Sequence, residues 1–125
     1  NTSPQIREFV IPLCANIHLA GSMITITSCV TSVLLMNNLD INFGIIIPFI
    51  LTLAVVMIAA PGAPGGAIMS AVPFLSMVGI DPDGALAGLL ITLYITQDSF
   101  GTACNVSGDN AIAIIVDNFY KKYIK

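Results

Sequence analysis

The uncharged stretch PGAPGG, residues 61–66, constrains the fold more than any other feature of this sequence. Its prolines and glycines cannot continue a helix, yet it lies between two apolar runs, residues 41–60 and 67–80. The second run is shorter than the roughly 20 residues that a helix needs to cross a bilayer. This arrangement predicts a re-entrant helical hairpin over residues 41–80, with its tip at residues 61–66.

Non-helical backbone at membrane depth is tolerated only where it is buried in protein or lines an aqueous cavity. The re-entrant interpretation therefore predicts that the hairpin tip, residues 61–66, borders a cavity. A tight external loop between two ordinary spans is the alternative that the sequence leaves open.

Charge is scarce along the whole chain, and this favours lipid as its solvent. Of its 125 residues, 56% are hydrophobic and 9% are charged, against about 25% charged in ordinary soluble domains. We therefore expect an all-α membrane protein with membrane lipid as a partner. The net charge of −3 and the absence of a basic stripe argue against binding to nucleic acid.

The remaining segments complete the expected organisation. Residues 1–8 are polar and predict a loop or the end of a preceding hairpin, and the start at Asn1 indicates a piece of a longer protein. Residues 9–36 are long enough to cross a membrane, with a break near residues 16–22. Short turns follow at residues 37–40 and 81–84, and a last helix is expected over residues 84–120, interrupted near residues 98–109. The tail, residues 121–125, carries three lysines, which place the C-terminus in the cytoplasm by the positive-inside rule.

The cysteines lie inside apolar stretches without CxxC spacing. We expect Cys14, Cys29 and Cys104 to be small buried hydrophobic residues rather than metal ligands or a disulfide.

Polar residues recur at helical spacing in the last segment. Asp98, Thr102, Asn105 and Asp109 lie at i, i+4, i+7 and i+11, which puts them on one helical face. A carboxylate at the centre of a bilayer costs about 2.5–3.5 kcal/mol or more, so two of them call for a counter-charge such as a cation or an ammonium group. Carboxylate, amide and backbone oxygens suit a hard ion such as Na⁺. The alternative is that both aspartates are protonated or hydrogen-bonded to another part of the chain.

His18 lies in the other broken segment, among apolar residues. Such a histidine is more often a satisfied structural group than a ligand. A histidine and aspartates in a membrane cavity nevertheless keep a proton-coupled mechanism open.

Three motifs resemble those of one family. NVSGD at residues 105–109, preceded by QDSFGTAC, resembles the NxxGD signature in the last transmembrane helix of the dicarboxylate/amino acid:cation symporters, the glutamate-transporter family. APGAPGGAIM at residues 60–69 resembles the tip of that family's second hairpin, and PLCANIHLAGS at residues 12–22 resembles the segment around its unwound NMDGT motif. The three motifs occur in the same order as in that family, and the similarity extends over essentially the whole chain.

The resemblance implies the fold and the activity. Residues 9–36 would be the seventh transmembrane helix, residues 41–80 the second re-entrant hairpin and residues 84–120 the eighth helix of an inverted-repeat transporter. The whole protein would be a homotrimeric secondary active symporter in the plasma (inner) membrane, not an enzyme, and would take up an amino acid or dicarboxylate. A channel-like or structural membrane subunit, whose polar stripe only mediates helix packing, is the alternative.

The resemblance also implies roles for single residues. The family's substrate contacts fall on the last helix and on the hairpin tip, at Asp98, Gly101, Thr102, Asn105, Ala63 and Pro64. Its Na⁺ ligands fall on Asn105 and Asp109, with backbone carbonyls near Cys14, Asn16, His18 and Leu19.

Departures from the family pattern modify these expectations. Gly101 stands where members that take acidic substrates place an arginine, so a carboxylate side chain would lack its bidentate partner. We therefore expect a neutral amino acid, such as cystine or serine, ahead of glutamate. His18 and Ala20 replace the asparagine and the aspartate of the NMDGT motif, so one cation site is missing or rebuilt, with fewer Na⁺ or with H⁺ through His18.

Overall fold

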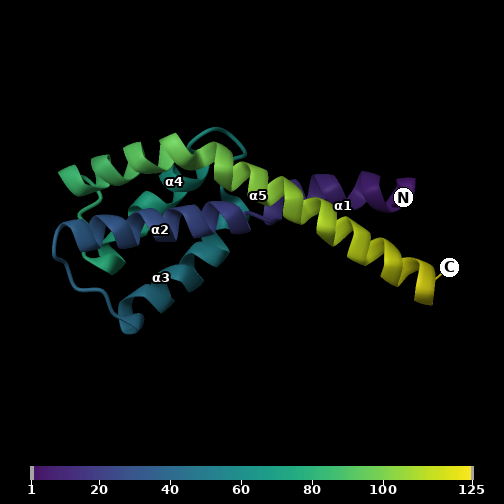
Figure 1. Ribbon diagram of the computed structural model, residues 1–125, viewed down its shortest axis with the longest axis horizontal. Coiled ribbons are helices and arrows are strands. Elements are labelled where there is room, and N and C mark those ends of the chain that lie inside the picture. The colour runs from purple at the N-terminus through teal and green to yellow at the C-terminus, as the bar shows by residue number, and fades with distance from the viewer. Residues whose placement is uncertain (1, 125) are drawn as a thin grey trace.

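The computed structural model describes residues 2–124 and, within them, contains only helices and connecting turns. The elements in chain order are α1 (Pro4–Ile17), α2 (Ala20–Met36), α3 (Phe43–Val56), η1 (Met57–Ala59), α4 (Gly66–Ala71), η2 (Val72–Val78) and α5 (Ala85–Tyr123). Helix α5 runs along the whole length of the molecule, with α2 and α4 beside its first half and α1 beside its second half, while α3 packs against α2 and the returning arm of the hairpin (Figure 1). The all-α prediction is confirmed.

The first apolar segment is broken at His18 and Leu19, within the expected range. The α1 helix ends at Ile17, and the His18 N–H still bonds the Cys14 carbonyl at 2.7 Å. Leu19, in the N-cap position of α2, has φ −113° and ψ 40° and offers no side-chain cap, so the first N–H groups of α2 need partners from elsewhere. The break therefore exposes polar backbone in the middle of the molecule.

Two expectations about the ends are corrected. The α1 helix begins at Pro4, because a proline at the first helical position is pre-organised for a helix and lacks only an N–H that would be unpaired there. Residues 4–8 are therefore helical, which corrects the loop alternative and leaves the end of a preceding hairpin as a prediction, while residue 1 lies outside the described part of the chain. At the other end α5 continues through Tyr123, so most of the expected tail is helical, and residue 125 is not described.

A third correction concerns the middle of α5. The helix is continuous over Ala85–Tyr123 and shows no interruption near residues 98–109. The segment contains no proline. The Ser107 hydroxyl donates a hydrogen bond to the Ala103 carbonyl at 2.8 Å, and the backbone hydrogen bonds of the helix continue past it. The polar residues are thus accommodated as side chains on an intact helix.

The second apolar region folds as a helical hairpin. The α3 helix is capped by Asn42, whose side chain accepts the Ile45 N–H at 3.1 Å. The chain then turns through residues 60–65 and returns through α4 and η2, and Gly79, with φ 78°, follows the end of η2. The two arms pack on each other and on α2 through the main core, which includes Phe49, Leu53, Leu75 and Leu90.

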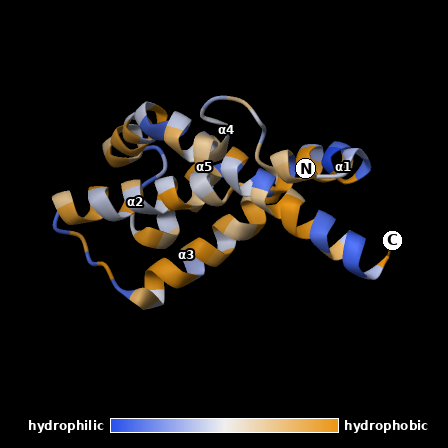
Figure 2. Cartoon of the chain, turned by 45° about the vertical axis from the view of Figure 1, so that its right-hand side comes forward, coloured by the Kyte–Doolittle hydropathy of each residue, from blue (hydrophilic) through white to orange (hydrophobic). Residues whose placement is uncertain are grey.

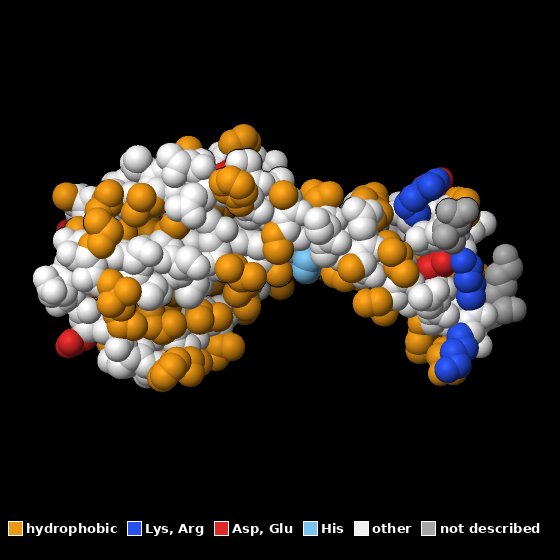
Figure 3. All heavy atoms as spheres, in the orientation of Figure 1, with side chains coloured by type: hydrophobic (Ala, Val, Ile, Leu, Met, Phe, Trp, Pro, Cys, Tyr) orange, Lys and Arg blue, Asp and Glu red, His pale blue; other side chains and the backbone are white. Residues whose placement is uncertain are grey.

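Apolar side chains also cover much of the outside. Phe43, Val55 and Phe100 are at least 70% exposed, and Figures 2 and 3 show hydrophobic residues over both arms of the hairpin and along α5. Among residues 2–124, the stretch Pro4–Met36 is long and apolar enough to span a bilayer. Cys14 and Cys29 are buried as expected, whereas Cys104 is exposed, which corrects that expectation; no disulfide joins these cysteines.

Candidate functional site

The polar face of α5, meaning Asp98, Thr102, Asn105 and Asp109, lines a cavity of about 410 Å³. The helical spacing that placed these four side chains on one face is confirmed. The hairpin tip and the broken first segment form the rest of the wall, through residues that include Pro61, Ala63, Pro64, Leu19 and Ser22. The expectation that the tip borders a cavity is also met, so three segments far apart in the sequence converge on one space.

Asn105 joins α5 to the start of α2. Its Oδ1 accepts the Gly21 N–H at 2.8 Å, and its Nδ2 donates to the Ser22 hydroxyl at 3.0 Å. The Asn105 side chain thus caps a helix whose own N-cap residue supplies no side-chain bond. Only 7% of Asn105 is exposed, so these bonds satisfy polar groups that water cannot reach well.

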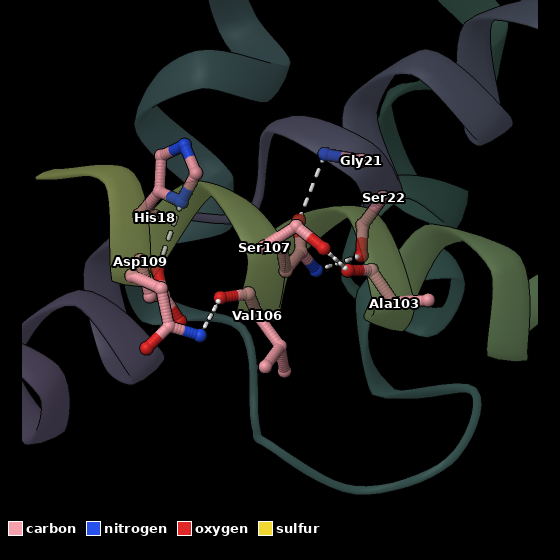
Figure 4. A network of polar contacts seen from close by, with 9 residues as sticks. His18, Gly21, Ser22, Ala103, Val106, Ser107 and Asp109 are labelled. Carbon is pink, nitrogen blue, oxygen red and sulfur yellow. Dashed lines mark hydrogen bonds and ion pairs between the residues drawn. The ribbon is translucent and has the colours of Figure 1, made fainter.

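Asp109 lies beside the break itself. Its Oδ1 is 2.9 Å from Nδ1 of His18, and Figure 4 shows the imidazole reaching across to the carboxylate. The Asp109 side chain is 6% exposed, and that of His18 is 27% exposed. A Cβ added at Gly108 would lie 2.4 Å from Cε1 of His18, so glycine at this position lets the ring approach α5.

Asp98 contacts the hairpin tip. Its Oδ2 accepts the Gly65 N–H at 3.0 Å. Gly65 has φ 75°, a left-handed conformation that glycine adopts without the steric penalty of a Cβ. The bond therefore connects the polar face of α5 directly to the tip that covers the cavity.

Four of the predicted site residues are not among those that line the cavity: Cys14, Asn16, His18 and Gly101. Gly101 is buried against α2 and is absent from the cavity wall. The two helices approach so closely here that a Cβ added at Gly21 would lie 2.3 Å from the carbonyl oxygen of Gly101. This glycine lets two helices touch, and its predicted substrate contact stays a prediction. The Asn16 amide points outward and bonds the Pro12 carbonyl at 2.7 Å, and the Cys14 side chain is buried near Val10 and Ala113. The cation contacts predicted for both residues involve their backbone carbonyls and stay predictions.

Two polar residues of the wall were missed from the sequence. Ser22 belongs to the HLAGS motif and was assigned no role, although it lines the cavity and receives the Asn105 amide. Tyr94 is fully buried in the wall, one helical turn before Asp98. Extending the i, i+4 spacing of the polar face back by one step would have found Tyr94.

The donor set fits a small hard cation. A carboxylate and an amide oxygen accept more than one bond each, so Asp109 and Asn105 keep acceptor capacity beside the contacts described above. Within residues 2–124 no three His, Cys, Asp or Glu side chains converge, so a transition-metal centre finds no support there. No Lys or Arg is among the residues that line the cavity, so its two carboxylates face the space without a fixed cation of that kind.

Comparison with known proteins gives the class that this arrangement belongs to. The family model described as "Sodium:dicarboxylate symporter family" matches residues 1–119. The chain therefore belongs to the sodium:dicarboxylate symporter family, a family of multi-pass membrane transporters and not of enzymes.

The chain is similar to several excitatory amino acid transporters. Excitatory amino acid transporter 1 of Rattus norvegicus is 32% identical over 125 residues, which cover 97% of this chain and 22% of that transporter. Excitatory amino acid transporter 5 of Mus musculus is 30% identical over 118 residues, covering 94% of the chain and 21% of the relative. The chain thus spans about a fifth of the length of these relatives. No solved structure matches it.

Proposed function

We propose that this chain is the C-terminal part of the mobile transport domain of a secondary active symporter, which couples amino acid uptake to a Na⁺ or H⁺ gradient. In this proposal residues 9–36 and 84–120 are the seventh and eighth transmembrane helices, and residues 41–80 are a re-entrant hairpin in an inverted-repeat fold. The complete protein would be a homotrimer.

One observation carries the proposal: the cavity formed by the polar face of α5, the break and the hairpin tip. Two aspartates in a mostly apolar enclosure are stable only with positive charge nearby, which a coupling cation and the ammonium group of an amino acid would supply together. The bond from the Gly65 N–H to Asp98 gives a physical link between the occupied site and the tip. Coupling follows if the closed tip is favoured only when both charges are present.

The proposed roles of the individual residues are those that the family resemblance implies. Asp98 would bind the substrate ammonium group, and Thr102 and Asn105 its carboxylate, beneath a tip that contains Ala63 and Pro64. Asn105 and Asp109 would hold the cation with backbone carbonyls around the break, from Cys14, Asn16, His18 and Leu19. Without Lys or Arg in the wall, a neutral substrate such as serine or cystine is favoured over the excitatory amino acids named for the relatives.

Charge distribution supports an orientation in the membrane. Arg7 and Lys121 border the same polar depression, and Lys122 follows directly, so the cationic side chains of residues 2–124 gather at one end of the molecule (Figure 3). Arg7 therefore adds to the lysines instead of opposing them. By the positive-inside rule this end would face the cytoplasm of a plasma (inner) membrane.

The test is uptake by the complete transporter in proteoliposomes. We expect radiolabelled serine or cystine to accumulate against its gradient under an inward Na⁺ or H⁺ gradient, and accumulation to collapse when an ionophore removes that gradient. Equilibration without accumulation, or no flux, would contradict symport.

A channel-like or structural subunit is the second candidate, and the Asn105 bonds to α2 favour it, because they show part of the polar face holding helices together. Flux that follows the substrate gradient alone would indicate this candidate.

A further inference from the structure

Tyr94 presents a polar group that the chain itself does not satisfy. The residue is 0% exposed and lines the cavity, yet its hydroxyl has no hydrogen-bond partner within residues 2–124. Ser22 and Asp98 are its polar neighbours in the cavity wall. Because a buried hydroxyl left unpaired is destabilising, one that belongs to a residue of the cavity wall would gain a hydrogen bond from a ligand that reaches it.

The position of Tyr94 selects which part of a substrate it meets. Along α5 it lies about 6 Å before Asp98, on the side away from Asn105, which lies about 10 Å beyond Asp98. This inference rests on the proposed function, in which Asp98 takes the ammonium group and Asn105 the carboxylate. The substituent of Cα that remains for Tyr94 is the amino acid side chain.

The charges around Tyr94 limit which substrate side chains could bind beside it. Asp98 is its closest titratable neighbour in the wall, and no Lys or Arg lines the cavity. A second carboxylate placed there would face Asp98 without a cation to pair with it, which is costly in an enclosed site. An uncharged hydroxyl or amide could instead both donate to and accept from the phenol.

We propose that Tyr94 is the specificity-determining residue of this transporter, and that its hydroxyl recognises small neutral amino acids whose side chains bear a hydroxyl or an amide. The site would then discriminate by hydrogen bonding rather than by charge. A site built to bond a hydroxyl disfavours the analogue that lacks it, because its own polar group is left unpaired.

The test compares L-serine with L-alanine, which differ by that hydroxyl, on the complete transporter in detergent at saturating Na⁺. Binding of radiolabelled L-serine and its displacement by L-alanine give both affinities. The variants are Tyr94→Phe and, as a control, Tyr123→Phe, which makes the same chemical change at a side chain that is 63% exposed near the end of α5. We expect Tyr94→Phe to weaken L-serine about 3- to 10-fold and L-alanine less than about 2-fold, with no change for Tyr123→Phe.

Thermal denaturation of the substrate-free protein supplies a second readout. Removal of an unpaired buried hydroxyl should leave the unfolding temperature of Tyr94→Phe unchanged or raised. A fall in that temperature, or an equal loss of L-serine and L-alanine affinity, would show that Tyr94 positions Asp98 or Ser22 and would overturn the inference alone. Failure of the unmodified transporter to bind either amino acid would overturn the proposed function as well.

Discussion

The two halves of the polar face of α5 differ in burial and in the number of hydrogen bonds that they make to other parts of the chain. In the later half, Asn105 and Asp109 are buried and bonded to residues at the break, Gly21, Ser22 and His18. In the earlier half, Thr102 is exposed and Asp98 is partly buried, and the contact between this half and the rest of the chain is one backbone N–H of the hairpin tip.

The later half therefore combines helix packing with its proposed part in the cation site, whereas the earlier half is left mainly for binding. Polar groups that are satisfied within the chain hold α5 against α2 and gain less from a ligand, since the ligand must compete with bonds already made. Polar groups facing the cavity without such bonds gain most when a ligand arrives. We therefore expect substitutions in the earlier half to change transport, and substitutions in the later half to change stability first.

The largest expected effect comes from Asp98→Ala. Loss of the proposed partner for the substrate ammonium group should reduce uptake of every amino acid about 100-fold or more, since breaking a buried charge pair costs about 3–5 kcal/mol. Asp83→Ala, in the exposed turn before α5, is the matched control and should transport normally. Uptake by the Asp98 variant at the level of the control would remove the assigned role of Asp98.

A smaller effect, on stability, is expected from Asn105→Ala. The variant leaves the buried Gly21 N–H unpaired, which should lower the free energy of unfolding by about 1–3 kcal/mol. Asn110→Ala removes the same side chain from the exposed face of α5 and should change it by less than about 0.5 kcal/mol. Thermal denaturation followed by circular dichroism compares the two, and equal shifts would contradict the idea that the later half holds the helices together.

The smallest effect is expected from glycine substitutions that probe the approach of His18. Gly108→Ala would put a Cβ 2.4 Å from the imidazole and displace it from Asp109, at a cost of about 1–2 kcal/mol offset in part by better helix propensity. Gly88→Ala, where a Cβ meets nothing within 4 Å, should stabilise α5 by about 0.5–1 kcal/mol. We expect the unfolding temperature to fall for Gly108→Ala and to rise for Gly88→Ala. A rise for both variants would show that the contact between His18 and Asp109 does not require a glycine at position 108.

Much of the organisation could be predicted from local sequence. The Pro/Gly stretch could only be a turn, the segment with His18 and Gly21 was expected to break, and the spacing of Asp98 to Asp109 was sufficient to place four side chains on one face. The expected interruption of α5 was wrong because polarity was taken as a sign of broken backbone, whereas polar side chains on one face do not by themselves require a break.

The sequence by itself determined that the chain needs an apolar solvent, where its helices turn, and which polar side chains share a face, because these depend on composition, proline and glycine chemistry and the period of the helix. The tertiary structure alone decided that Asn105 caps α2, that His18 meets Asp109, that Gly101 faces α2 instead of the cavity, and that Tyr94 is enclosed without a partner. The physical reason is that helical periodicity orders the residues around one helix, whereas the rotation and depth at which a second helix packs against it depend on contacts between residues distant in the chain.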